Sequence, residues 1–235
     1  MRALALNTGP LDVYRHMALD EAVAGAFSDA CVLRFYRWSG PGVTFGYAQS
    51  LQEVGRALPG KAKGWPLARR PTGGGVVVHD DDVTFSCVFP APEGFKPERV
   101  YAGLHGALRS ALAAQGLAAE LKSGPATAAD YAPSSGGVSS ACFSNPVPQD
   151  LLGRDGEKIL GGALRRYEKV VLYQGSLQLP GARGRSAELE RALSQGLCEV
   201  FDVQWTEVGV GEDLLRECEN LARSRYMTQD WNSRF

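Results

Sequence analysis

The chain has 235 residues, of which 44% are hydrophobic, and its 25 basic residues almost balance its 26 acidic ones. The formal net charge of -1 provides no general basic face for nucleic-acid binding, which depends on displacing counterions. A run of about 18 apolar residues would predict a membrane-spanning helix, and the sequence contains none. We therefore expect one domain over residues 1–235, with neither nucleic acid nor a membrane as its partner.

The five cysteines are scattered, and none belongs to a CxxC pair or to a Cys/His cluster with zinc spacing. We therefore predict no metal site, and no disulfide framework in a chain of this length. The apolar run at residues 1–6 is too short for a signal peptide. Reduced thiols without a secretion signal favour a cytoplasmic protein.

In the first half of the chain, helical and strand-like patterns alternate. Apolar residues recur at four-residue spacing within residues 12–30, which predicts a helix. Strands are expected at residues 31–38 and 43–47, and a short helix near residues 51–58. Two stretches rich in β-branched and aromatic residues, 76–79 and 83–89, predict strands joined by the acidic turn 80–82.

In the second half, Pro97 begins a predicted helix that ends at Gln115 and Gly116. Residues 123–140 are dominated by Ser, Gly, Ala and Pro, which predicts a long loop. A hairpin over residues 151–160, a strand over 170–179 and two final helices complete the chain. Strands and helices mix without a βαβ repeat, so we predict an α+β fold, with a mixed, largely antiparallel sheet flanked by helices.

The stretch richest in chemical information is Arg69-Arg70-Pro71-Thr72-Gly73-Gly74-Gly75, which continues as Val76-Val77-Val78-His79. Three glycines allow a backbone to come close to a ligand and to point N–H groups at an anion. Neighbouring arginines can neutralise a phosphate or a carboxylate. A glycine-rich hairpin with solvated arginines is the alternative that the residues alone leave open.

This stretch resembles the RRxxGGGxVxH signature of the lipoate–protein ligase and octanoyltransferase family. Residues 16–21 resemble the early helix of that family, and residues 41–47 resemble its first substrate-pocket strand. Residues 156–163 resemble its GxKIxGxA segment. Four matching segments in order cover roughly residues 12 to 179 and imply the biotin/lipoate protein ligase catalytic fold.

The resemblance assigns the essential lysine of the family to Lys158. By its residue type alone, Lys158 would be an exposed hairpin lysine, since lysine is seldom buried. In this family the lysine contacts the acyl carbonyl, where a fixed ammonium stabilises the oxyanion formed during acyl transfer. The resemblance further implies a substrate-binding set made of Arg70, Thr72, Gly73, Gly74, Gly75, Val76, His79, Gly161, Ala163 and Trp38. His79 and Trp38 also fit ordinary packing roles.

Cys142 distinguishes the branches of the family, because the cysteine-dependent octanoyltransferases carry a Cys-Phe pair at the matching position. A cysteine is more often a small buried hydrophobe than a nucleophile. Cys142 instead lies at the end of the predicted polar loop, sixteen residues before Lys158. A thiolate near an ammonium has a lowered pKa and attacks thioesters readily. The other four cysteines are interpreted as packing residues.

Two features depart from the transferase pattern. Many transferases have GGR where this chain has Gly73-Gly74-Gly75, and the triple glycine resembles the ligases. Many relatives also carry a histidine in the last strand, where this chain has Gln174. Either difference could alter which donor or acceptor is used.

Three functions are consistent with these residues, and the closest resemblance is to the cysteine-dependent octanoyl-acyl carrier protein:protein octanoyltransferases. Such an enzyme would move an octanoyl or lipoyl group from acyl carrier protein, through a Cys142 acyl-enzyme, to a lysine of a lipoyl-carrier domain. The carrier would be a glycine-cleavage carrier protein or a 2-oxoacid dehydrogenase subunit, and no cofactor is expected. The second function is an ATP-dependent lipoate–protein ligase that forms lipoyl-adenylate and needs ATP and Mg. The third is a non-catalytic protein that binds acyl groups or carrier domains. We expect a monomer in each case.

Overall fold

The computed structural model describes residues 1–124 and 146–235, and its main feature is an eight-stranded sheet. In spatial order the strands are β11 (Thr206–Gly209), β1 (Arg2–Asn7), β2 (Ala30–Phe35), β6 (Val83–Pro90), β10 (Val170–Leu177), β9 (Lys158–Arg166), β8 (Leu151–Leu152) and β7 (Glu120–Leu121). The strands β11, β1 and β2 are parallel, and every pair from β2 to β7 is antiparallel. The predicted mixed, largely antiparallel sheet is therefore confirmed.

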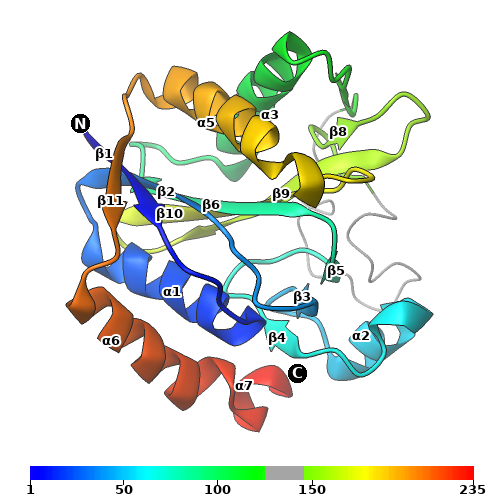
Figure 1. Ribbon diagram of the computed structural model, residues 1–235, viewed down its shortest axis with the longest axis vertical. Coiled ribbons are helices and arrows are strands. Elements are labelled where there is room, and N and C mark those ends of the chain that lie inside the picture. The colour runs from blue at the N-terminus through cyan, green and yellow to red at the C-terminus, as the bar shows by residue number, and fades with distance from the viewer. Residues whose placement is uncertain (125–145) are drawn as a thin grey trace.

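A smaller sheet of three strands lies beside the main one (Figure 1). Its order is β4 (Leu67–Arg69), β3 (Gly42–Phe45) and β5 (Val77–His79). The sequence predicts two strands joined by the turn Asp80–Asp82, and both exist, but β5 belongs to the small sheet and β6 to the main one. The acidic turn thus carries the chain from one sheet to the other.

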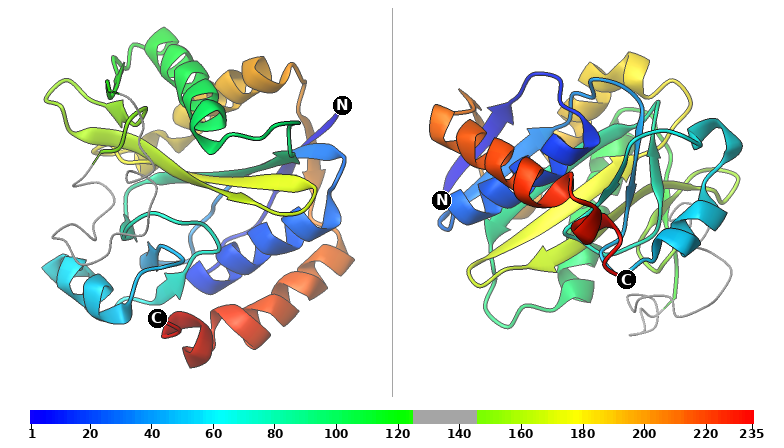
Figure 2. Two further views of the ribbon diagram at one scale, coloured as in Figure 1. Left: turned by 180° about the vertical axis from the view of Figure 1, so that it is seen from behind. Right: turned by 90° about the horizontal axis from the view of Figure 1, so that it is seen from below.

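Two helical layers enclose the main sheet, as Figures 1 and 2 show from three directions. One face is covered by α3 (Pro97–Ala114) and α5 (Ser186–Phe201), and the other by α1 (Val13–Ala26) and α6 (Glu212–Leu221). The short helix α2 (Leu51–Ala57) accompanies the small sheet, and α7 (Gln229–Asn232) packs against β4. Within the described residues, no helix is long and apolar enough to cross a membrane.

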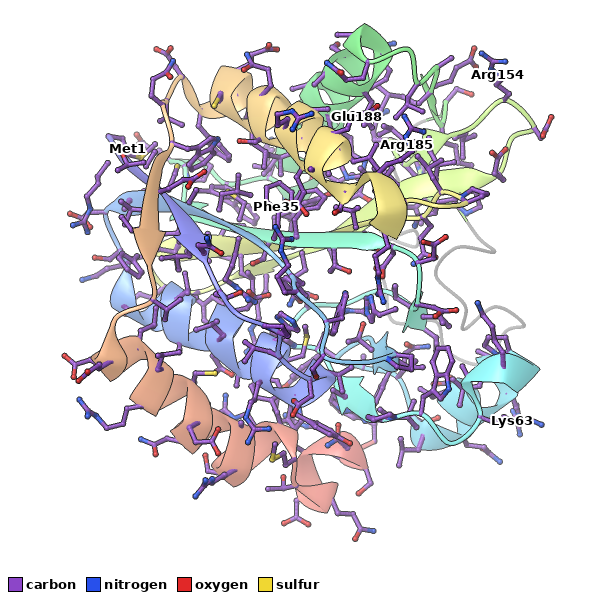
Figure 3. All side chains as sticks on the ribbon, viewed as in Figure 1. Met1, Phe35, Lys63, Arg154, Arg185 and Glu188 are labelled. Carbon is purple, nitrogen blue, oxygen red and sulfur yellow. The ribbon has the colours of Figure 1, made fainter. Side chains whose placement is uncertain are left out.

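The apolar spacing of the sequence explains how α3 and α5 pack. Leu104, Leu108 and Leu112 on α3 are fully buried, as are Leu189, Leu193 and Leu197 on α5. Burying each such side chain contributes roughly 1.5–3 kcal/mol. Figure 3 shows side chains filling the space between these helices and the sheet.

The two faces of the central strands differ in polarity. Phe85 and Cys87 on β6, like Val171 and Tyr173 on β10, point into the core under α3 and α5. On the opposite face, Val88, Val170 and Leu172 pack against α1 at one end of the strands. Farther along the same face, alternation places Thr84, Ser86, Gln174 and Ser176, which are all buried. A buried polar surface therefore lies where the main sheet meets the small one.

Several element boundaries differ from the sequence prediction. The first helix ends at Ala26 rather than near residue 30, and β2 ends at Phe35 rather than at Trp38. Residues beyond Phe35 remain extended but bond to Leu11, whose amide donates to the carbonyl of Arg37. The sequence predicts no strand at β1, β4, β7 or β11, and of these β4 and β7 are too short to show an alternating pattern.

Candidate active site

A cavity that is open to solvent lies between the two sheets. Thr84, Gln174 and Ser176 line it from the main sheet, together with Gly161, Gly162 and Ala163 of β9. Thr44, Val77, Arg70 and Gly74 line it from the side of the small sheet, and Met17 and Tyr36 complete the lining. Its lining is mostly apolar with a few convergent polar groups, which is typical of small-ligand sites.

The glycine loop of residues 73–75 is held from within by Arg70. The guanidinium of Arg70 donates to the carbonyl oxygens of Gly73 and Gly75, both at 2.8 Å, and to Thr44 Oγ1 at 2.9 Å. Gly74 has φ +88°, a conformation that glycine adopts without strain. A Cβ atom at Gly46 would lie 1.8 Å from the Gly74 carbonyl oxygen, so the loop packs directly on the end of β3. Arg70 therefore shapes the loop.

Arg69, although adjacent in sequence, points away from the cavity toward the C-terminal residues. Its guanidinium donates to the backbone carbonyls of Tyr47, Gln49, Trp231 and Asn232 at 2.6–2.9 Å. Burial, together with nearby Arg234, lowers the Arg69 pKa to about 10, so the side chain remains charged at neutral pH. The paired arginines suggested that both neutralise an anion. Arg69 does not, because its guanidinium donates to backbone carbonyls instead.

His79 lies behind the cavity wall in a buried polar cluster. Its Nδ1 lies 2.8 Å from Asp82 Oδ2, and its Nε2 lies 2.8 Å from Thr44 Oγ1. Trp38 stacks on its ring with centroids 4.3 Å apart. For Asp82, burial raises the pKa, but the charge of His79 and hydrogen bonds from neighbouring groups outweigh it and lower the pKa overall. His79 thus links Asp82 to Thr44, which accepts the hydrogen bond from Arg70.

Gln174 bridges the main sheet and the glycine loop. Its Nε2 donates to Asp20 Oδ2 at 2.6 Å, and its Oε1 accepts from Thr72 Oγ1 at 2.6 Å. Asp20 on α1 also accepts hydrogen bonds from Tyr36 and from the guanidinium of Arg34, at 2.6 Å from Nη2. The side chains of Asp20 and Arg34 are each only 1% exposed. The side-chain amide of Gln174 therefore connects Thr72, next to the glycine loop, to Asp20 on α1.

Lys158 is a buried lysine rather than an exposed hairpin residue, because its side chain is 2% exposed. The Lys158 Nζ lies 2.8 Å from Asp150 Oδ2, and the Asp150 side chain is fully buried. A Cβ atom at Gly161 would lie 2.4 Å from that Nζ. Gly161 is paired with Ser176, so this Cβ would point to the face that carries the cavity. The ammonium of Lys158 therefore lies on the cavity side of β9.

The structure brings together most of the substrate-binding set named from sequence. Arg70, Gly74, Gly161 and Ala163 line the cavity, and the end of the Lys158 side chain lies against Gly161. The others form its support: Gly73 and Gly75 accept from Arg70, Thr72 bonds to Gln174, and His79 and Trp38 stack behind the wall. Val76 instead packs into the core of the small sheet. Cys142 lies outside the described residues.

Sequence reasoning missed Asp150 and Tyr101, which contact the lysine segment from outside any recognised motif. Tyr101 comes from the apolar stripe of α3, where a tyrosine looks like ordinary core. Asp150 directly precedes the strand β8. A lone acidic residue next to a buried hairpin is the one signal that could have suggested a partner for Lys158.

The two sheets, with a glycine loop on one side of the cavity and Gly161 beside a buried lysine on the other, have the fold of the lipoate–protein ligases. The crystal structure of lipoate-protein ligase A bound with ATP superposes with a TM-score of 0.77, at 25% identity, over 99% of both chains. The chain belongs to the family described as the lipoyl protein ligase A/B catalytic domain, whose model matches residues 12–206.

Relatives in this family include two bacterial proteins named octanoyltransferase LipM. The protein of Moorella thermoacetica is 35% identical over 182 residues, which cover 74% of this chain and 64% of that protein. The protein of Brevibacillus brevis is 27% identical, over 93% of this chain and 94% of that protein. The more similar alignment thus spans slightly less than two thirds of its relative's length.

Proposed function

We propose that this protein is an octanoyltransferase, which moves an octanoyl group from acyl carrier protein to a lysine of a lipoyl-carrier domain. The observation that carries this proposal is the mostly apolar cavity with the Lys158 ammonium beside Gly161 of its lining. An apolar cavity suits a fatty-acyl chain, and a fixed cation beside it suits the acyl carbonyl. Relatives named octanoyltransferase support the same activity.

Cys142 is the proposed nucleophile, and the other cysteines support this choice by exclusion. Burial raises the pKa of Cys31 and of Cys218 to about 11, and it raises the pKa of Cys87 still more clearly. Burial also raises the pKa of Cys198. Because the thiolate is the reactive form, these four are poor nucleophiles at neutral pH.

The proposed reaction has two steps that share one acyl pocket. The Cys142 thiolate attacks the octanoyl thioester, the new C–S bond forms, and the carrier thiolate leaves and takes up a proton. The neutral amine of the target lysine then attacks the acyl-enzyme. A C–N bond forms, the C–S bond to Cys142 breaks, and the amine gives up a proton. In both steps Lys158 stabilises the negative oxygen of the tetrahedral intermediate.

The proposed partners are acyl carrier protein and a lipoyl-carrier domain of the glycine-cleavage system or of a 2-oxoacid dehydrogenase. Neither carrier has to enter the cavity, because each needs to deliver only its acyl chain or its lysine. The thioester already holds the free energy needed to form an amide, so the transferase requires no ATP.

An ATP-dependent lipoate ligase is the second candidate, and one comparison favours it. The similar structure of lipoate-protein ligase A was solved with ATP bound. In that case the glycine loop and Lys158 would face an acyl-adenylate, and magnesium would be required. Release of pyrophosphate after adding lipoate, ATP and magnesium identifies this activity, and the transferase predicts none.

Intact-protein mass spectrometry after mixing with octanoyl-acyl carrier protein, without ATP, tests the proposal. Wild type should gain one octanoyl group, and Cys142→Ala should gain none. Cys198→Ala is the matched control, because it removes a partly exposed thiol and should acylate like wild type. An unmodified wild type, or an adduct on Cys142→Ala, would contradict the transferase mechanism.

A further inference from the structure

A closed circuit of polar contacts surrounds Gly161 on β9. Lys158 Nζ contacts Asp150 Oδ2 at 2.8 Å, and Tyr101 donates its hydroxyl to Asp150 Oδ1 at 2.5 Å. The same hydroxyl accepts the backbone N–H of Gly162 at 2.9 Å. The circuit therefore begins and ends on the same strand and passes through α3 and the turn before β8. Such a closed path fixes the lysine side chain against the backbone that carries it.

The Asp150 carboxylate is fully supplied with donors. Its Oδ2 accepts the backbone N–H of Val147 at 2.7 Å as well as the Lys158 ammonium, while its Oδ1 accepts from Tyr101. A carboxylate is an acceptor only, so three converging donors fit the ionised form. Because both side chains are nearly inaccessible to water, each charge needs the other.

A neighbouring side chain, His105 on α3, adds no charge to this pair near neutral pH. His105 bonds to the Tyr173 hydroxyl of β10 at 2.9 Å. Burial and the neighbouring Lys158 lower the His105 pKa to about 3, so its ring is neutral near pH 7. Asp150 is therefore a negatively charged partner of the ammonium at hydrogen-bonding distance.

We propose that Asp150 and Tyr101 are positioning residues that hold the Lys158 ammonium, in its charged form, at the edge of the cavity beside Gly161. This inference rests on the proposed role of Lys158 in stabilising the oxyanion. Neither residue needs to touch the substrate. A rigid ammonium costs no reorganisation when charge develops on the acyl oxygen, whereas a freely rotating lysine would.

The test is steady-state octanoyl transfer to a lipoyl domain by Asp150→Asn and Tyr101→Phe. Asp150→Asn keeps the shape but removes the charge, and we expect kcat to fall about 100-fold, as misplaced catalytic groups do. Tyr101→Phe keeps the ion pair, and we expect a loss of about tenfold, the size of one hydrogen bond to a charged group. KM for both carriers should stay within about threefold, because only the transition state is affected.

Two matched controls separate positioning from general damage. Tyr167→Phe removes a buried hydroxyl that has no hydrogen-bond partner among the described residues. Asp213→Asn removes an exposed ion pair with Arg216. Both should transfer like wild type. Thermal melts of every variant verify that it is folded under assay conditions.

A double-mutant comparison distinguishes this inference from the function on which it rests. If Asp150 acts through Lys158, adding Asp150→Asn to Lys158→Ala should cause no further loss. An inactive Lys158→Ala beside folded and fully active Asp150→Asn and Tyr101→Phe would overturn the positioning role alone. A fully active Lys158→Ala would instead overturn the proposed role of the lysine itself.

Discussion

At the scale of single residues, the absence of a side chain at Gly161 leaves room for the side chain of Lys158. The end of the Lys158 side chain lies on the cavity side of Gly161, and its Cε would be only 2.1 Å from an added Cβ, far inside van der Waals contact. The lysine can lie across the strand only because nothing projects from residue 161. The second glycine of the GxKIxGxA segment thus has a steric explanation in this structure.

Gly161→Ala should therefore impair both activity and stability. The new methyl group would lie 2.1 Å from Lys158 Cε, and the lysine would have to move away from Asp150 to relieve the contact. We expect octanoyl transfer to fall about 100-fold, and the free energy of unfolding to fall by about 3 kcal/mol, because a buried carboxylate loses its partner. Transfer assays and urea titrations measure the two effects. Gly103→Ala on α3, where a Cβ meets nothing within 4 Å, is the matched control. Normal transfer by Gly161→Ala would refute this explanation.

Residues that belong to a sequence motif could be predicted from the sequence. Residues that contact the motif only in the folded structure could not. Lys158 and Gly161 were found because their neighbours in sequence form a recognisable segment. Asp150 and Tyr101 were not, because their roles arise from tertiary contacts between α3, β8 and β9. Gln174 was found only as a departure from a pattern, and its two-ended bridge required the structure.

At the scale of elements, the long helices were predictable and the short strands were not. Each of α3 and α5 carries three leucines at four-residue spacing, which places them along one face of a helix, and each element is longer than an ordinary strand. By contrast, β4 has three residues and gains its stability from elsewhere. The helix α7 provides additional hydrogen bonds to β4. Asn232 Oδ1 accepts the backbone N–H of Arg69, and Trp231 Nε1 donates to the backbone carbonyl of Arg69. Side chains of α7 thus bond to this strand as a neighbouring strand would.

Arg69→Lys should weaken this connection between α7 and the small sheet. A lysine keeps the charge but cannot reproduce a planar guanidinium that reaches several carbonyl oxygens in different directions. We expect the free energy of unfolding to fall by about 1–3 kcal/mol, measured by urea denaturation. Arg216→Lys, at an exposed ion pair, should stay within about 0.5 kcal/mol of wild type. Equal stability of Arg69→Lys and wild type would show that the carbonyl contacts contribute little.

At the scale of the whole molecule, two buried histidines make the protein sensitive to acid. Burial and the adjacent Arg34 lower the His16 pKa well below its ordinary value, and burial with Lys158 lowers the His105 pKa to about 3. In the unfolded chain both rings take up protons below about pH 6.5. Because the unfolded state then binds more protons than the folded state, stability must fall as the pH falls.

Urea titrations at several values between about pH 7 and pH 5 measure this dependence. Each histidine contributes a slope approaching about 1.4 kcal/mol per pH unit below its unfolded pKa. His105→Gln should remove one such contribution and flatten the slope, whatever its effect on stability at pH 7. An unchanged slope would mean that His105 becomes protonated without unfolding. A single transition in these titrations would also support one domain over residues 1–235.

The cavity between the two sheets also has a consequence for the order in which the chain folds during synthesis. Its walls are joined by hydrogen bonds between partners 102 and 100 residues apart, Thr72 with Gln174 and Val78 with Gln178. Contacts of such long sequence separation form late, because the intervening chain must first lose its freedom. A ribosome adds about 5–20 residues per second. Several seconds therefore pass between synthesis of the glycine loop and synthesis of the strand that carries Gln174. A nascent chain that has emerged only as far as Lys158 carries the lysine but no closed pocket. A cavity with both walls in place therefore requires the chain at least as far as Gln178.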